Sequence, residues 1–65
     1  MISYSDISQK TDQYIDLYVA SSDSSDGDLV EYEFRGFLQG LIFSKVICSE
    51  VHDTLLNKFL LSTGL

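Results

Sequence analysis

The sequence predicts an all-α fold, in which a small helical hairpin is followed by a third helix within a single domain spanning residues 1–65. Two observations lead to this prediction. Apolar residues recur at spacings of three and four in three stretches, as they do on one face of a helix. Between the first two stretches lies a polar run, and the chain contains no proline.

The first helix is predicted over residues 6–20. Asp6 and Gln9 lie three residues apart and form a candidate capping pair at its start. The apolar side chains that follow have helical spacing, and polar residues occupy the other side. The predicted buried face comprises Ile7, Thr11, Tyr14, Ile15 and Tyr18. The run from Ser21 to Asp28 is rich in turn-forming residues and is expected to connect this helix to the next.

The second helix is predicted from near Asp28 to about Ile47, and it is the most apolar part of the chain. Its main stripe comprises Val30, Phe34, Phe37, Leu38, Leu41 and Ile42. Small residues recur every four positions at Gly36, Gly40 and Ser44, a spacing that allows another helix to approach closely. The alternative is that these small residues only make room for neighbouring aromatic rings.

The third helix is predicted to begin with Ser49 as its N-cap, with Glu50 and Asp53 in the first turn. Gly64 is expected to end it. Its apolar face comprises Val51, Leu55, Leu56, Phe59 and Leu60. Because no glycine or proline separates the second and third helices, one long continuous helix is the alternative.

The small size of the chain favours association. A chain of 65 residues and 7.3 kDa buries only about 60% of its unfolded surface. Three helices of this size cannot enclose every apolar residue, so we expect Ile42, Phe43, Val46, Ile47 and Leu61 to lie outside the core of one chain. Self-association through the second helix, as a symmetric homodimer, is therefore predicted. The residues expected there are Gly36, Gly40, Phe43, Ser44 and Ile47.

The acidic charge is concentrated in the first half. The formal net charge is −6, and eight of the ten acidic residues lie in residues 1–33 with Lys10 as the only base there. Such a charge repels nucleic acid and favours a basic protein surface. We therefore expect a non-enzymatic inhibitor, adaptor or regulator that masks a basic surface on a protein partner. The acidic face is expected to comprise Asp12, Asp16, Asp23, Asp26, Asp28 and Glu31. A merely solvated face is the alternative.

The acidic connection also resembles the twelve-residue calcium loop of the EF-hand family. In the segment from Ser22 to Glu33, the turn position is Gly27, the apolar eighth position is Leu29, and the first position is a serine rather than an aspartate. The resemblance implies a calcium-responsive binding module as the alternative function. Its implied metal ligands are Ser24, Asp26, Asp28 and Glu33. An acidic turn that caps the next helix explains the same residues without metal.

Other functional classes find little support in the sequence. Cys48 and His52 are four residues apart, but two ligands do not make a metal site, and nothing signals the further groups that a cysteine nucleophile needs. We predict no catalytic residue and no cofactor. The most apolar window is shorter than a membrane span, so no membrane contact is expected. A single cysteine and no signal-type segment after Met1 favour a cytoplasmic location.

Overall fold

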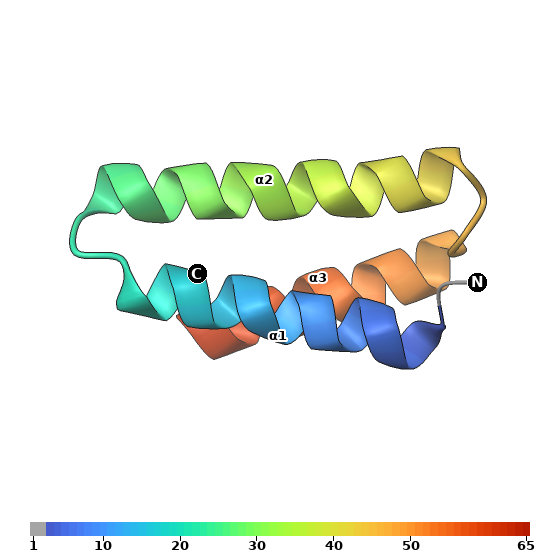
Figure 1. Cartoon of the computed structure of the whole chain (residues 1–65), viewed down its shortest axis with the longest axis horizontal. Helices are drawn as coiled ribbons and strands as arrows, with labels where there is room; N and C mark the ends of the chain where they lie inside the picture. Colours follow the sequence, from blue (N-terminus) through green and yellow to red (C-terminus); the bar gives the residue numbers. More distant parts are fainter. Residues whose placement is uncertain (1–2) are drawn as a thin grey trace.

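A computed structural model describes residues 3–65 of the chain, which form three α-helices. They are α1 (Tyr4–Ala20), α2 (Ser24–Phe43) and α3 (Ser49–Thr63). α1 and α2 form an antiparallel hairpin, and α3 returns beside α1 in the same direction (Figure 1). The bundle is elongated, with principal extents of 34 × 19 × 19 Å. The described residues contain no strand, so the predicted all-α hairpin with a third helix is confirmed.

α1 begins earlier than the sequence predicted. Ser3 is the N-cap, its hydroxyl accepts the backbone N–H of Asp6, and the Asp6 carboxylate accepts the N–H of Ser3. This reciprocal pair is a capping box, in which two otherwise unpaired backbone donors are satisfied. The predicted pairing of Asp6 with Gln9 is wrong, because Asp6 is the third residue inside the helix and not its cap.

α2 also begins earlier than predicted. Asp23 is its N-cap and accepts the backbone N–H of Asp26 at 2.9 Å, so residues 24–28 form helix and not loop. Gly27 is buried there, and a Cβ at this position would lie only 3.2 Å from Cε2 of Tyr18. Glycine therefore allows α2 to approach the Tyr18 ring, whereas the sequence had suggested that it served a turn.

The break between α2 and α3 is confirmed, although α2 ends at Phe43 and not near Ile47. The N–H of Lys45 donates to Ile42 O, and the N–H of Val46 donates to Leu41 O, both at 2.9 Å. This pattern is a Schellman motif, which normally places glycine in the left-handed conformation. Here Lys45 takes that conformation, with φ of 62°.

α3 is capped one residue earlier than predicted. Its N-cap is Cys48, whose side chain makes no capping hydrogen bond, and Ser49 is the first helical residue. Gly64 ends the helix in the left-handed conformation at φ 79°, as predicted. The N–H groups of Gly64 and Leu65 both donate to Leu60 O, which satisfies that carbonyl.

The core forms where the three helices meet. Phe34 of α2 and Phe59 of α3 are stacked with ring centroids 4.5 Å apart, and Tyr18 of α1 meets Phe59 edge-on at 5.7 Å. Buried Thr11 satisfies its hydroxyl by donating to Ile7 O within α1. The buried apolar residues are Ile7, Phe34, Leu38, Leu41, Leu55 and Phe59. They match the apolar faces that the sequence predicted.

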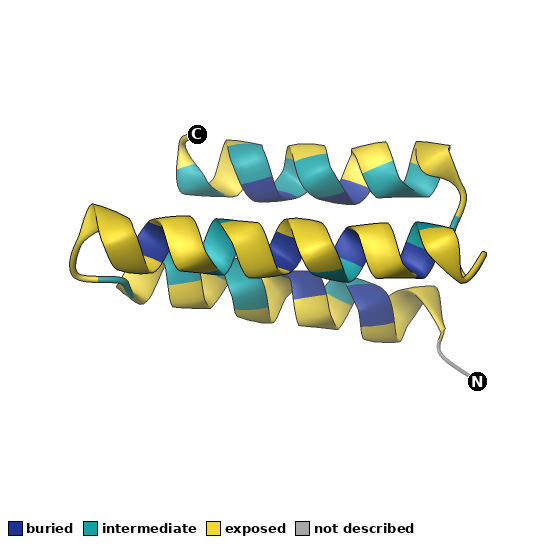
Figure 2. Cartoon of the chain, turned by 90° about the horizontal axis from the view of Figure 1, so that it is seen from above, coloured by how far each residue is buried: buried dark blue, intermediate teal, exposed yellow. Residues whose placement is uncertain are grey.

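Much of α2 lies outside this core. Seen from the side of α2, its ribbon is exposed along most of its length, with buried positions only at intervals (Figure 2). Among the described residues, no helix is both long enough and apolar enough to cross a membrane.

Candidate protein-binding surfaces

The α1–α2 turn gathers acidic side chains at one end of the bundle. Asp16 lies one turn before the end of α1, Asp23 caps α2, and Asp26 and Asp28 lie in its first turns. We call these four residues the acidic end. Residues 13–30 contain no lysine or arginine, and all four carboxylates are exposed. The helix positions thus bring together four of the six residues predicted for the acidic face.

The other two predicted acidic residues are paired within the chain. The Nζ of Lys58 lies 2.7 Å from Oδ1 of Asp12, and the Nε of Arg35 lies 2.8 Å from Oε2 of Glu31. Lys58 also donates to the Ser8 hydroxyl at 3.3 Å, so it ties α3 to α1. Within residues 3–65, no ion pair involves a carboxylate of the acidic end. Its charge is therefore available to a partner.

Exposed apolar side chains border the acidic end. Leu17 and Val19 are 56% and 67% exposed on α1, and Leu29 is 61% exposed on α2. Protein interfaces commonly combine apolar contact with charged groups at the rim, and complementary charge steers the encounter. Leu17 and Val19 were not among the surface residues predicted from the sequence. Their positions on α1, away from the Ile7 and Thr11 spacing, are the signal that could have found them.

A second surface runs along α2. Leu29, Tyr32, Gly36, Gly40 and Phe43 follow one another at spacings of three or four, and we call them the outer face of α2. Tyr32 is 79% exposed and Phe43 is 90% exposed. A Cβ at Gly36 or Gly40 would meet no atom within 4 Å, so neither glycine serves a close contact inside the bundle.

The predicted self-association residues divide between this face and the end of α2. Gly36, Gly40 and Phe43 lie on the outer face, whereas Ser44 caps the C-terminus and donates its hydroxyl to Gly40 O. Ile47 is half-buried against the core. Phe43, Val46 and Leu61 are exposed as expected, but Ile42 and Ile47 are partly covered. Leu29 and Tyr32 were missed, although they lie seven and four residues before Gly36 on the same helical line.

The loop geometry implied by the EF-hand resemblance is wrong. Ser24 to Glu33 are all helical, so they do not wrap around a central point. On a helix, Asp26 and Glu33 are about 10 Å apart along the axis, and Asp28 lies on another side. In residues 3–65, no group of three or more His, Cys, Asp or Glu side chains is arranged to hold a metal ion.

Cys48 and His52 do not form a joint site. Cys48 is exposed at the start of α3. His52 Nδ1 lies 3.1 Å from Asp53 Oδ1, with the His52 side chain 15% exposed. The imidazole therefore interacts with its neighbour on α3.

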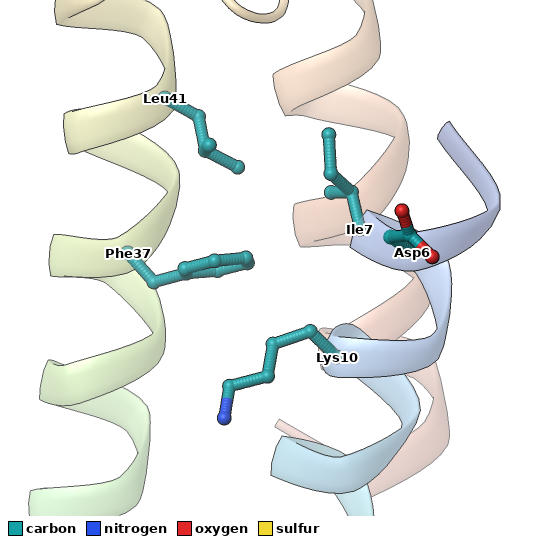
Figure 3. A pocket seen from close by; sticks show the side chains of 5 residues that line it. All are labelled: Asp6, Ile7, Lys10, Phe37 and Leu41. Atoms are coloured by element: carbon teal, nitrogen blue, oxygen red, sulfur yellow. The ribbon is translucent and has the colours of Figure 1, made fainter. Parts of the chain in front are cut away.

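A shallow groove lies between α1 and α2 on the side away from α3. It has a volume of about 210 Å³ and is lined by Asp6, Ile7, Lys10, Phe37 and Leu41. Phe37 and Leu41 extend from α2 toward Ile7, and Lys10 reaches beside them (Figure 3). The lining contains no nucleophile paired with a base, so it lacks the arrangement that nucleophilic catalysis uses.

Comparison of the chain with protein-family models, with curated proteins and with solved structures finds no match.

Proposed function

We propose that this protein acts by binding another protein, and that its acidic end recognises a basic surface on that partner. It would act without catalysis, as an inhibitor, adaptor or regulator, in the cytoplasm and as a homodimer. No direct contact with nucleic acid or membrane is part of this proposal. The observation that carries it is the combination, at the α1–α2 turn, of carboxylates that form no ion pair within residues 3–65 and exposed apolar residues.

Each group at this end contributes to binding in a different way. The exposed carboxylates attract a basic surface from a distance and raise the association rate at low salt. Leu17 and Val19 offer apolar area that becomes buried after the encounter. Asp23 has a structural task as well, because its side chain caps α2. Asp16 and Asp28 have no such task and are the better residues to change.

The experiment is quantitative capture of partners from cell extract by three forms of the chain. These are the wild type, the Asp16→Lys/Asp28→Lys variant, and a control with the same charge change at the opposite end, Glu50→Lys/Asp53→Lys. Helicity of each is checked first, because Glu50 lies in the first turn of α3. A partner held by wild type and control but lost by the first variant supports the proposal. Equal capture of every partner by all three forms contradicts it.

A further inference from the structure

We propose that two copies of this chain pack through the outer face of α2, antiparallel, about a two-fold axis that passes beside Gly36. This inference rests on the proposed function only in taking the chain to self-associate. It keeps Gly36, Gly40 and Phe43 from the predicted surface, replaces Ser44 and Ile47 by Leu29 and Tyr32, and specifies a register, which the sequence prediction did not give. Its test needs no basic partner, so its failure would leave recognition by the acidic end standing.

The first argument is the cost of the two glycines in α2. A glycine inside a helix costs about 0.5–1 kcal/mol relative to alanine. No contact inside the bundle offsets this cost, because a Cβ at Gly36 or Gly40 would meet open space. Gly27 is the contrast, since its missing Cβ makes room for Tyr18. Close approach of a second helix is the use that remains for Gly36 and Gly40.

The second argument is the order of large and small residues along the face. With the axis beside Gly36, the turn that holds Tyr32 faces the turn of the second copy that holds Gly40. In the same way, the level of Leu29 faces the level of Phe43. The large Tyr32 therefore opposes the small Gly40 on both sides of the axis, whereas Leu29 and Phe43 form an apolar contact at each end of the face. A parallel pair would instead place Tyr32 against Tyr32 and leave two Gly40 residues facing each other.

The third argument is charge. Acidic residues occupy the first half of α2 and its cap, at Asp23, Asp26, Asp28, Glu31 and Glu33, and the bases Arg35 and Lys45 follow. A parallel pair would bring five acidic residues against five. In the antiparallel pair the acidic half of each α2 faces the end of the other that carries Lys45, and Asp28 lies near the level of Lys45. Like charges are thus kept apart.

The area available fits a dimer of modest affinity. An aromatic side chain offers roughly 150–250 Å². With Tyr32 79% exposed and Phe43 90% exposed, the aromatic residues of two copies supply roughly 500–800 Å². Leu29 and the uncovered backbone at the glycines add to this total and bring it toward the lower end of specific interfaces, at about 1,200 Å².

In this dimer the two acidic ends would lie at opposite ends of the molecule. Asp23 lies thirteen residues before Gly36, so the two α1–α2 turns would be about 40 Å apart along the helix axis. A partner with two basic sites at that spacing would bind both acidic ends at once, with a higher overall affinity than a single site gives.

The first test measures the oligomeric state by sedimentation equilibrium over a range of protein concentrations. We expect the wild type to rise from 7.3 kDa toward twice that mass. Gly40→Leu fills the close-approach position without touching the bundle, and Tyr32→Ser/Phe43→Ser removes the exposed rings. Each is expected to raise the dissociation constant by about tenfold or more while remaining helical. Leu61→Ser, which removes an apolar residue exposed on α3, is the control and should leave the dimer unchanged.

The second test measures the register by disulfide formation in a Cys48→Ser background. Gly36→Cys should cross-link with its own copy, because both lie at the axis. Leu29→Cys should not, because the two copies of residue 29 would be about 21 Å apart along the helix. A wild type that stays monomeric, or variants on the outer face that dimerise as well as the wild type, would overturn the proposed surface. Cross-linking of Leu29→Cys with itself would overturn the antiparallel register.

Discussion

Alanine substitution at Gly36 and Gly40 separates the stability of one chain from its association. The measurement is best made in a Phe43→Ser background at low protein concentration, where the weakened dimer does not contribute to the measured stability. Neither added Cβ would meet an atom within 4 Å, so only helix propensity changes. Each substitution is expected to raise the free energy of unfolding by about 0.5–1 kcal/mol. For a domain of this size, each kcal/mol raises the thermal midpoint by roughly 4–8 °C.

The other two glycines serve as internal controls for this assay, which follows helicity by circular dichroism during thermal and urea unfolding. Gly27→Ala should gain less or lose stability, because its Cβ would lie 3.2 Å from the Tyr18 ring. Gly64→Ala should lose about 1 kcal/mol, because φ there is +79°. If Gly36→Ala and Gly40→Ala fail to stabilise the Phe43→Ser chain, the conclusion that these glycines face open space is wrong.

Three further substitutions test the helix ends and the core, each followed by urea unfolding. Cys48→Ser should add an N-cap hydrogen bond to α3 and stabilise the chain by about 0.5–1 kcal/mol, whereas Ser49→Ala should change its stability little. A larger effect of Ser49→Ala than of Cys48→Ser would show that Ser49 is the cap. Lys45→Gly should relieve the left-handed backbone and stabilise by about 1 kcal/mol, so a loss of stability would contradict the Schellman assignment. Phe59→Ala should lower the free energy of unfolding by about 3–5 kcal/mol, enough to abolish the helical signal in a domain this small. A cooperative urea transition near that of the wild type would contradict the stacked core.

The helices and their buried faces could be predicted from the sequence because apolar spacing reports directly on which side of a helix is covered. Phe34, Leu38 and Leu41 are buried, and they lie in the predicted stripe. The helix starts could not be predicted as well. Several short polar residues lie near the starts of α1 and α2, and any of them has the chemistry of an N-cap, whereas α3 begins after Cys48, whose side chain makes no capping hydrogen bond. Packing chooses between them, as when Gly27 must lie inside α2 to accommodate Tyr18.

The outer face of α2 shows a different limit. Gly36 and Gly40 were correctly marked as a line of small residues, but periodicity alone does not tell whether such a line faces another helix of the same chain or open space. The structure shows that it faces open space. Aromatic residues at helical spacing are usually buried, so the sequence alone does not separate Tyr32 from Phe34 and Phe37. Only the position of α3, against Phe34 and not Tyr32, reveals that its ring is exposed.

The most direct measurement of the central claim is a map of the binding surface by amide chemical shifts of the labelled chain, recorded as a captured partner is added. Recognition by the acidic end predicts that the perturbed amides cluster around the α1–α2 turn, in residues 16–29, and that the perturbation weakens as salt is raised. The first turns of α3 should remain unperturbed at the same partner concentration. Perturbations centred on α3 or on the groove between Lys10 and Phe37, and insensitive to salt, would contradict the claim.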